Sequence, residues 1–258
     1  MIPKILLSFD IEEFDMPLEY GFEISPEKQF EIGKNGLDAL MPILENSQIQ
    51  TTLFTTANFA NEYPAEIIAL SKQHEIASHT YFHSKFETTD LLTSRLKLEE
   101  IIKKPVTGLR MPRMKQVPIQ DIINAGYQYD ASIHPTWLPG RYNNLGLPRT
   151  IFKQEGLVRI PASVTPNFRI PLFWLSFKNF PYSVYRTLAM QTLKRDGYIS
   201  LYFHPWEFVN IDSFGLPSYT KKGCNGALLA QLSLLIKNLQ EQGQFITMQQ
   251  FQHNYLLD

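Results

Sequence analysis

Short apolar runs that alternate with amphipathic segments are the feature that most limits how this chain can fold. Runs of four to five mostly apolar residues are typical of strands buried on both faces of a parallel sheet. There are eight such runs: Ile5–Phe9, Thr51–Thr55, Glu75–Ser78, Val106–Leu109, Tyr127–Ala131, Leu157–Ile160, Ile199–Phe203 and Gln244–Thr247. Five further segments space their apolar residues at three and four, which predicts helices: Pro64–Lys72, Thr89–Lys103, Pro118–Asn124, Ser183–Arg195 and Ala227–Gln240. This order predicts an α/β fold, a single irregular (β/α) barrel with seven or eight parallel strands.

No linker, repeat or low-complexity tract interrupts this pattern, so we expect one domain over residues 1–258. One segment, about residues 134–182, departs from the pattern because it holds seven of the 17 prolines and nine of the 33 aromatic residues. Proline at this density disfavours long helices and favours structured loops. Two interpretations remain open: a loop-rich insertion with its own small core, or a wall that faces the substrate.

Charge and cysteine content exclude some partners and point to a compartment. The formal net charge is −1 and no basic cluster is present, so nothing attracts a polyanion and we exclude nucleic acid as a partner. The single cysteine, Cys224, has no partner for an intrachain disulfide. No apolar stretch approaches the ~18–20 residues of a membrane span, and the N-terminal run lacks the features of a signal peptide. We therefore expect a cytoplasmic protein.

Polar residues of the metal-binding and acid–base types follow several of the predicted strands. In a parallel barrel all strands point the same way, so residues after the strands meet at one end, where barrel enzymes build their active sites. Asp10 and Glu12 follow the first strand, His79 the third, Arg110 the fourth and His204 the seventh, while Asp130 lies near the end of the fifth. The sequence therefore predicts that these side chains converge.

The spacing of His79 and His83 favours a metal site. Two histidines four residues apart on a helical turn can bind one metal ion, although an isolated pair of this kind is often only a pair of surface histidines. Asp10 and Glu12 project to the same side of an extended chain. One of them can then bind the metal while the other takes a proton from bound water.

Arg110 and His204 are candidates for supporting and proton-donating roles. A guanidinium directly after a buried strand would hold a carboxylate in its ionised state, whereas a plain surface arginine is the competing interpretation. His204 stands between an apolar strand and the segment Pro205-Trp206-Glu207. Its near-neutral pKa would allow it to donate a proton to a leaving amine.

Taken together, these motifs resemble the polysaccharide deacetylase family, the NodB-homology group of carbohydrate esterase family 4. Five motifs carry the resemblance in order, and they cover nearly the whole chain: Ser8-Phe9-Asp10-Ile11-Glu12-Glu13, His79-Thr80-Tyr81-Phe82-His83, Arg110-Met111-Pro112, Tyr129-Asp130-Ala131-Ser132 and Leu201-Tyr202-Phe203-His204. The Asp-x-Glu spacing and the His204-Pro205-Trp206-Glu207 segment are most similar to the subgroup linked to exopolysaccharide synthesis.

The resemblance implies a metal-dependent hydrolase that removes N-acetyl groups from an acetylated amino sugar in a glycan or glycan precursor. It implies a divalent cation, zinc by preference, held by Glu12, His79 and His83. By the same resemblance Asp10 is the general base, although the roles of Asp10 and Glu12 could be exchanged because Ile11 separates them.

Further roles follow from the same resemblance. Arg110 steadies Asp10, and His204 is the general acid. Asp130 orients His204 or supports Arg110. Two apolar residues, Leu201 and Trp206, enclose the acetyl methyl group, and a backbone amide near Arg113 contributes to oxyanion binding.

Three alternatives stay open. The chain could act on small cyclic amides or ureides, as the allantoinase-like branch of the same fold does, although we expect that branch to be able to dispense with the His-His-acid trio. A second alternative is a non-catalytic, sugar-binding descendant. The aromatic run Phe173-Trp174-Leu175 further raises the hypothesis of peripheral contact with a membrane, where a lipid-linked precursor would be met.

Overall fold

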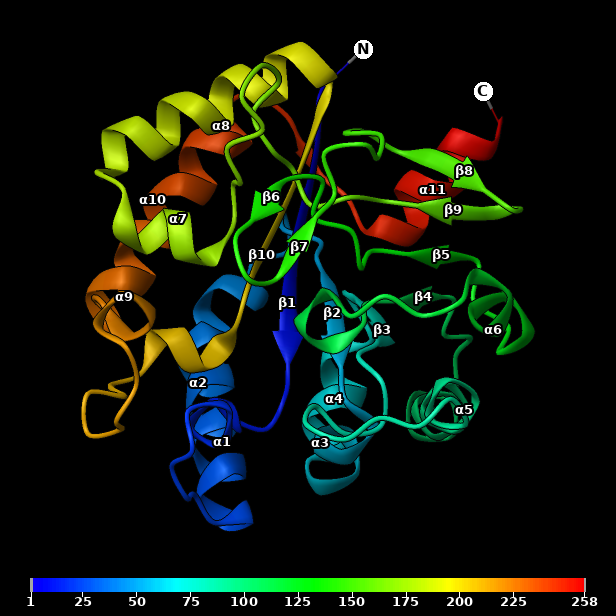
Figure 1. The fold of residues 1–258 in the computed structure, drawn as a ribbon, viewed down its shortest axis with the longest axis vertical. Coiled ribbons are helices and arrows are strands. Elements are labelled where there is room, and N and C mark those ends of the chain that lie inside the picture. Colours follow the sequence, from blue (N-terminus) through cyan, green and yellow to red (C-terminus); the bar gives the residue numbers. More distant parts are fainter. Residues whose placement is uncertain (1, 258) are drawn as a thin grey trace.

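A computed structural model describes residues 2–257 and shows one curled, mostly parallel sheet of nine strands (Figure 1). The strands lie in the order β10 (Tyr198–Phe203), β1 (Lys4–Ile11), β2 (Thr52–Thr55), β3 (Glu75–Ser78), β4 (Gly108–Leu109), β5 (Tyr129–Asp130), β9 (Leu157–Arg159) and β8 (Phe152–Gln154), with β11 (Gln244–Phe245) pairing with the start of β1. All eight predicted strands are confirmed, and the antiparallel strand β8 was not predicted.

The sheet forms an irregular, incompletely hydrogen-bonded barrel, as the sequence predicted. Strand β8 ends the sheet on one side and β10 ends it on the other. The segment after β9 reaches across this gap, where the Ser163 N–H donates to the Ser200 carbonyl oxygen at 2.9 Å and the Ser163 Oγ accepts from the Ser200 N–H at 2.8 Å. A single extended segment therefore joins the two sides of the half-barrel.

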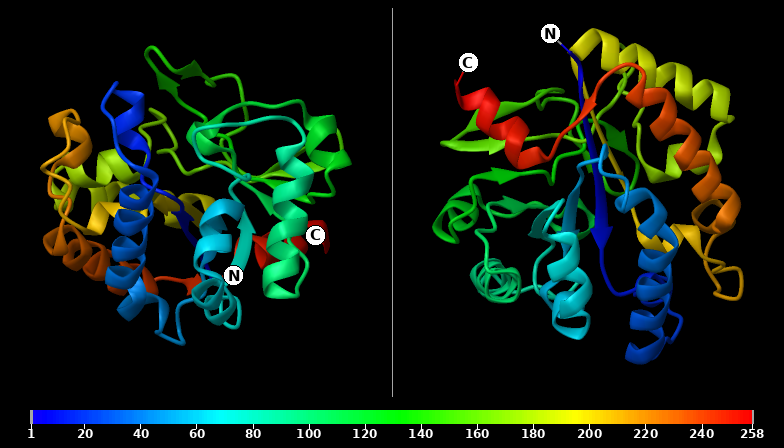
Figure 2. Two further views of the ribbon diagram at one scale, coloured as in Figure 1. Left: turned by 90° about the horizontal axis from the view of Figure 1, so that it is seen from below. Right: turned by 180° about the vertical axis from the view of Figure 1, so that it is seen from behind.

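Helices surround the outer face of the curled sheet (Figure 2). The five predicted helices are confirmed as α4 (Pro64–Leu70), α5 (Asp90–Ile102), α6 (Ile119–Asn124), α8 (Tyr182–Asp196) and α10 (Gly226–Gln240). The structure adds α1 (Met16–Glu19), α2 (Pro26–Leu44), α3 (Ala57–Glu62), α7 (Trp174–Asn179), α9 (Ser218–Lys221), α11 (Met248–Leu257) and the 3₁₀ turns η1 (Pro112–Met114) and η2 (Pro205–Phe208). None of these helices is long and apolar enough to cross a membrane.

The interior of the barrel is apolar at one end and polar at the other. Inward-facing Leu6, Phe54 and Tyr129 form a buried cluster with Met248 of α11, and Phe251 of the same helix packs against it. Helix α11 thereby closes the end of the barrel at which the parallel strands begin. The opposite end, where the strands finish, is left for polar side chains.

The segment of residues 134–182 contains short elements, as its proline content predicted. A hairpin is formed by β6 (Trp137–Leu138) and β7 (Tyr142–Asn143), in which Leu138 pairs with Tyr142. Strands β8 and β9 follow, and helix α7 lies near the end of the segment. Figure 1 shows the hairpin in front of β1 and β10.

Helix α2 packs unusually closely against the segments that carry functional residues. A Cβ atom on Gly36 would lie 2.4 Å from the Pro205 carbonyl oxygen, and one on Gly33 would lie 2.5 Å from the Glu12 carbonyl oxygen. Two glycines and an internal proline, Pro42, weaken the helical signal of α2 in the sequence. The glycines are required because the backbones of β1 and η2 occupy the space that side chains would fill.

We expect Gly36→Ala to destabilise the fold. Alanine normally favours a helix over glycine, but here its methyl group would overlap the backbone at Pro205. Overpacking of this kind costs roughly 1–3 kcal/mol in the free energy of unfolding, which urea denaturation measures. Gly146→Ala is the matched control, because nothing lies within 4 Å of a Cβ at that position. Equal stability of both variants would contradict this account.

Candidate active site

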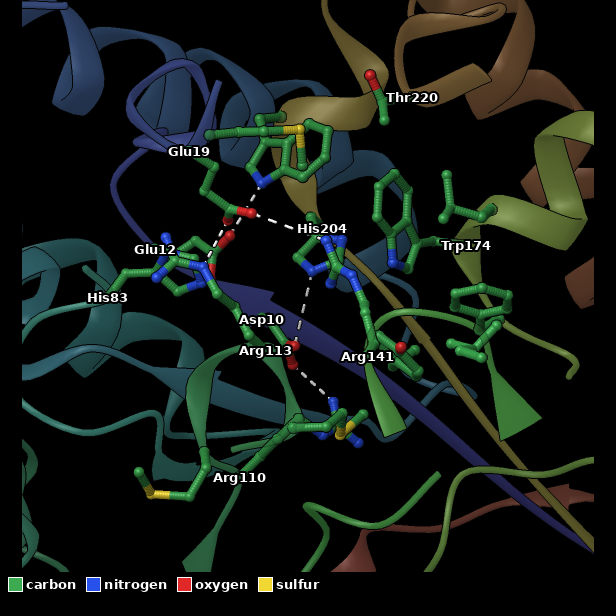
Figure 3. A pocket seen from close by; sticks show the side chains of 18 of the residues that line it. Asp10, Glu12, Glu19, His83, Arg110, Arg113, Arg141, Trp174, His204 and Thr220 are labelled. Atoms are coloured by element: carbon green, nitrogen blue, oxygen red, sulfur yellow. Dashed lines mark hydrogen bonds and ion pairs between the residues drawn. The ribbon is translucent and has the colours of Figure 1, made fainter. Parts of the chain in front are cut away.

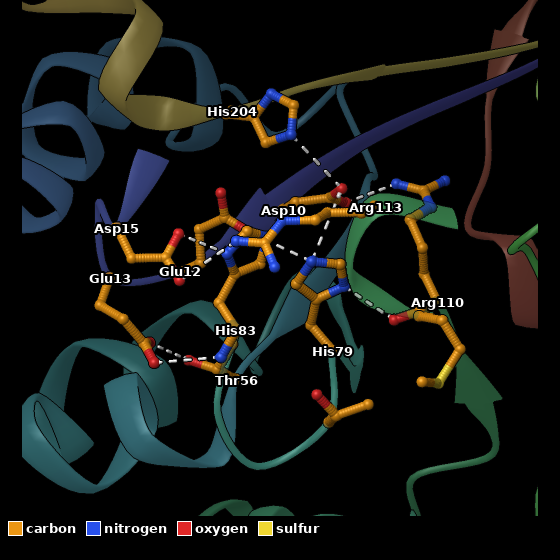
Figure 4. Close-up of polar contacts among 12 residues, drawn as sticks. Asp10, Glu12, Glu13, Asp15, Thr56, His79, His83, Arg110, Arg113 and His204 are labelled. Atoms are coloured by element: carbon orange, nitrogen blue, oxygen red, sulfur yellow. Dashed lines mark hydrogen bonds and ion pairs between the residues drawn. The ribbon is translucent and has the colours of Figure 1, made fainter. Parts of the chain in front are cut away.

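Glu12, His79 and His83 form a candidate metal site at the polar end of the barrel (Figure 4). The side chain of Glu12 comes from the residue after β1, and the two histidines come from the loop after β3. The Glu12 Oε2 atom lies 3.1 Å from His79 Nε2 and 3.2 Å from His83 Nε2. The three potential ligand atoms lie within 4.8 Å of one another.

The hydrogen bonds of the two histidines indicate what belongs between these atoms. His79 Nδ1 lies 2.7 Å from the Arg110 carbonyl oxygen, and His83 Nδ1 lies 2.6 Å from Asp15 Oδ1. Both partners only accept, so each Nδ1 must carry a proton, and in the neutral ring the lone pair is then on Nε2. Two lone pairs face the buried Glu12 Oε2, which has no hydrogen-bond partner. With both rings neutral, three acceptor atoms are directed at one point, and this donor set fits a metal ion.

Two further acids, to which the sequence analysis gave no role, are buried beneath His83. Asp15 accepts from the His83 ring, as described above. Glu13 Oε2 accepts from the Thr56 hydroxyl at 2.7 Å, and Glu13 Oε1 accepts from the His83 N–H at 3.2 Å. Glu13 therefore fixes the backbone at His83 and Asp15 fixes its ring. The sequence analysis assigned roles to Asp10 and Glu12, which follow the first strand directly. No local sequence signal distinguishes Glu13 and Asp15 from surface acids.

Charge at His83 is coupled to the metal site. Burial lowers the pKa of His83, but the carboxylates of Glu12 and Asp15 outweigh this effect and raise that pKa to about 9. Without a metal ion the His83 ring is therefore protonated on both nitrogens at neutral pH and carries a positive charge. Metal binding at this site must displace that proton.

Asp10 and Arg110 form a buried ion pair beside the metal site. The Arg110 Nη1 donates to Asp10 Oδ1 at 2.6 Å, and its Nη2 donates to the Ser8 hydroxyl at 3.0 Å. The other oxygen, Asp10 Oδ2, lies 3.9 Å from His79 Nε2 and 3.8 Å from His204 Nε2. The prediction that Arg110 holds a carboxylate is confirmed by this contact, and Asp10 keeps one oxygen free toward the pocket.

His204 is oriented by a carboxylate that the sequence analysis did not assign. Glu207 Oε1 accepts from the His204 N–H at 2.8 Å and lies 3.1 Å from His204 Nδ1. Glu207 Oε2 in turn pairs with the buried Lys178 Nζ at 2.9 Å. The spacing of three residues between His204 and Glu207 is the sequence signal for this contact, because the 3₁₀ turn η2 brings them together.

The surroundings of His204 favour its protonated form. Burial lowers the pKa of His204, but the hydrogen bond that its ring donates to Glu207 and the nearby carboxylates of Glu12 and Asp10 outweigh this effect and raise that pKa. The ring also stacks on Trp206, with 4.9 Å between ring centroids. Trp206 lines the pocket, and its Nε1 donates to Glu12 Oε1 at 3.0 Å.

Two sequence-based assignments need correction. Asp130 contacts neither His204 nor Arg110: it accepts from the Ser132 hydroxyl and pairs with Arg159 Nε at 3.0 Å. The Ser132 hydroxyl in turn accepts a hydrogen bond from the Met111 N–H. Asp130 therefore helps to fix the loop after β4 through Ser132. Leu201 does not border the site, because it alternates with the pocket-lining Tyr202 along β10 and packs in the helix-side core.

A pocket of about 220 Å³ opens above Asp10 and His204 (Figure 3). Part of its wall comes from the aromatic segment: Phe173 and Trp174 line it. Phe173 is buried, and Trp174 packs against both His204 and Trp206. The segment is thus a pocket wall rather than the exposed aromatic face that the membrane hypothesis required. Arg113 also lines the pocket, and its backbone has a φ of 55°.

Comparisons with known proteins agree with the motifs. Residues 21–129 match the sequence model of a family described as polysaccharide deacetylase. This range contains His79, His83 and Arg110, but it excludes Asp10, Glu12 and His204. A search of curated proteins found no match.

Solved structures show the same fold at low sequence identity. A putative polysaccharide deacetylase from Mycobacterium smegmatis has a TM-score of 0.65 and 16% identity, over 97% of this chain and 89% of that one. A probable polysaccharide deacetylase from Pseudomonas aeruginosa PAO1 has a TM-score of 0.65 and 13% identity, over 98% and 90%. Puue allantoinase has a TM-score of 0.64 and 16% identity, over 98% and 89%. These similarities confirm the fold, and the sequence match to the polysaccharide deacetylase model covers residues 21–129 of it.

We expect Asp15→Asn to weaken metal binding without removing a ligand. Asparagine lacks the charge that favours a protonated Nδ1 on His83, so the ligand becomes a poorer donor. Loss of such a supporting carboxylate typically costs about 10–100-fold in metal affinity. Competition with a chromophoric chelator measures the dissociation constant for Zn²⁺.

The control is Asp212→Asn, which removes an exposed acid and should leave the dissociation constant unchanged. Zn²⁺ affinity of the Asp15→Asn variant equal to that of the wild type would show that Asp15 does not support a metal ligand.

Proposed function

We propose that this protein is a polysaccharide deacetylase, a metal-dependent hydrolase that removes an N-acetyl group from an acetylated amino sugar. The observation that supports this most strongly is the placement of three metal-donor atoms beside an arginine-paired carboxylate and a carboxylate-paired histidine. Amide hydrolysis needs these parts: activation of water, stabilisation of an oxyanion and protonation of the leaving nitrogen.

Glu12, His79 and His83 would hold the metal ion, and zinc suits this set of nitrogen and oxygen donors. Bound there, a divalent cation would acidify a water molecule and stabilise negative charge on the acetyl oxygen. The Trp206 indole N–H donates a hydrogen bond to Glu12 Oε1, so Oε2 is the oxygen that would bind the cation. The contacts of His79 and His83 fix both rings with Nε2 toward the same point.

The contacts support Asp10 as the general base and Glu12 as the ligand, rather than the reverse. Arg110 holds one oxygen of Asp10, while Oδ2 faces the pocket. Glu12 Oε2 faces both histidines. Asp10 would take the proton of the attacking water, because its free oxygen lies between His79 and His204.

His204 would act as the general acid on the other side of Asp10. Glu207 accepts a hydrogen bond from the Nδ1 of His204. The Nε2 atom is therefore directed at the pocket and available to protonate the leaving nitrogen. The raised pKa favours the protonated form of His204, which is the form that can donate to the leaving nitrogen. Trp206 and Tyr202 provide apolar surface for the acetyl methyl group, and we retain the backbone amide at Arg113 as a candidate oxyanion donor.

We further propose that residues 1–258 act as one catalytic domain and that the segment 134–182 is its substrate-facing part. The contacts across the whole chain support this. Residues from β1, from the β3 and β4 loops, and from the end of β10 meet in one pocket, which Phe173 and Trp174 of the segment line.

Hydrolysis of a cyclic ureide is the second candidate function, because the fold is as similar to Puue allantoinase as to the deacetylases. The metal-donor set argues for the deacetylase. Dependence on metal and release of acetate separate the two activities.

We expect the Zn²⁺-loaded protein to release acetate from acetylated amino sugars and to leave allantoin unchanged. Asp10→Asn should keep the metal and lose several orders of magnitude in rate, because it removes the base but no ligand. Glu12→Gln should instead lose metal affinity. Acetate release and metal content per chain are the two measurements, and the opposite pattern in the two variants would exchange their roles.

We expect His204→Ala to slow hydrolysis of an acetylated amine by ~10²–10⁴, the usual contribution of a general acid. An activated ester, whose leaving group needs no proton, should lose much less. Steady-state rates on both substrates give the comparison, and His253→Ala is the control because that histidine is exposed. Equal losses on both substrates would make His204 a positioning residue instead of an acid.

A further inference from the structure

We propose that the pocket receives the end of a saccharide or a single acetylated amino sugar, and not an internal residue of a long polymer. This inference rests on the proposed function and adds a substrate class to it. The observation that carries it is a closed ring of contacts among the elements that surround the pocket mouth. A polymer bound at an internal residue leaves the site in two directions, so it needs two openings in the wall.

Helix α1 contacts three of its neighbours around the mouth. Glu19 Oε1 lies 2.5 Å from the Nε of Arg113 in η1, and Glu19 Oε2 lies 3.7 Å from the Nη2 of Arg141 in the hairpin. The adjacent Tyr20 meets Tyr219 of α9, with 3.4 Å between their hydroxyl oxygens. All five of these side chains line the pocket. Figure 3 shows Glu19, Arg113 and Arg141 around Asp10 and His204.

Helices α9 and α7 close the next part of the ring. The Asn179 side chain donates to the Tyr219 carbonyl oxygen at 2.8 Å. The buried Lys178 Nζ donates to the Thr220 carbonyl oxygen at 2.9 Å, and its charge lies 4.8 Å from the centroid of the Trp174 ring. Thr220 and Trp174 both line the pocket. One exposed contact and one buried contact therefore join α9 to α7.

The hairpin completes the ring through His134, a residue that the proposed mechanism does not use. Its Nδ1 lies 2.9 Å from the Tyr142 hydroxyl, and its ring packs on Phe173 at 4.9 Å between centroids. Burial lowers the pKa of His134 to about 3, so this hydrogen bond joins two uncharged groups. Tyr142 and Phe173 line the pocket from the hairpin and from the start of α7.

The contact that joins the hairpin to α1 is the weakest contact of the ring. The Arg141–Glu19 ion pair is exposed and 3.7 Å long, so it contributes little free energy. The backbone of the hairpin is held independently, because the Asn144 N–H donates to the Thr136 carbonyl oxygen at 2.9 Å and Thr136 Oγ1 donates to the Arg169 carbonyl oxygen at 2.7 Å. The enclosed volume of about 220 Å³ is below the ~300–1,000 Å³ of pockets that bury drug-sized ligands.

The test uses the Zn²⁺-loaded protein with N-acetylglucosamine and its β-1,4-linked tetramer. Tandem mass spectrometry locates the free amine in the tetramer products. We expect internal residues to react at least about tenfold more slowly than a terminal one, which corresponds to ~1.4 kcal/mol of lost transition-state stabilisation. Internal residues that react as fast as terminal ones would overturn the proposal and leave the deacetylase function intact.

Opening the ring should relax this preference. The double variant Arg141→Ala with Tyr219→Ala removes two of the rim contacts and none of the proposed catalytic groups. We expect its ratio of internal to terminal deacetylation to rise. Arg186→Ala, an exposed arginine of α8, is the matched control and should keep the wild-type ratio.

A second measurement does not use turnover. The affinity of the Asp10→Asn variant for the monosaccharide and for the tetramer, from isothermal titration, should be similar, because a closed pocket offers few contacts to further sugar residues. Affinity that rises steadily with chain length would overturn the proposal. Absence of acetate release from every acetylated sugar would refute the proposed function instead, and the inference with it.

Discussion

The buried ion pair between Arg110 and Asp10 is the contact on which the rest of this site depends. A guanidinium with 1% of its surface exposed is costly to bury unless it is paired, and Asp10 at 2.6 Å supplies the compensating charge. The cation also lies 4.0 Å from the centroid of Phe54 and 5.0 Å from that of Tyr202.

The same arginine couples several strands. Its side chain comes from the residue after β4 and holds Asp10 and Ser8 of β1, while the aromatic rings beside it belong to β2 and β10. Its carbonyl oxygen accepts a hydrogen bond from the Nδ1 of His79, which follows β3. One residue therefore sets the proposed base, the orientation of a proposed metal ligand and the relative positions of five strands.

The distribution of polarity inside the barrel explains why the site lies where it does. Helix α11 and the apolar cluster around Leu6 and Phe54 fill one end, so water and substrate can enter only at the other. There each proposed functional histidine has a buried acceptor behind it: Asp15 behind His83, the Arg110 carbonyl behind His79 and Glu207 behind His204. These contacts fix ring orientation, which a catalytic site requires before it binds any ligand.

The sequence by itself determined the fold class and most of the site. The eight apolar runs could be predicted as strands because a strand that is buried on both faces of a parallel sheet has a nearly continuous apolar sequence. Asp10, Glu12, His79, His83, Arg110 and His204 could be predicted to meet because parallel strands end on one side. Helix α2 was not predicted, because its glycines weaken the helical signal. The reason for these glycines is the close packing of the helix against the backbones of Pro205 and Glu12, which the sequence does not show.

Only the tertiary structure decided the contacts that join distant segments. The partners of Asp130, the outward direction of Leu201 and the burial of Glu13 and Asp15 depend on side-chain direction and on neighbours up to 70 residues away. The ring of contacts around the pocket mouth likewise arises from five elements that share no sequence pattern. Residue type and spacing determine which chemistry can gather at the end of a sheet, but long-range packing determines which atoms face it, because burial free energy belongs to the assembled molecule and not to any local segment.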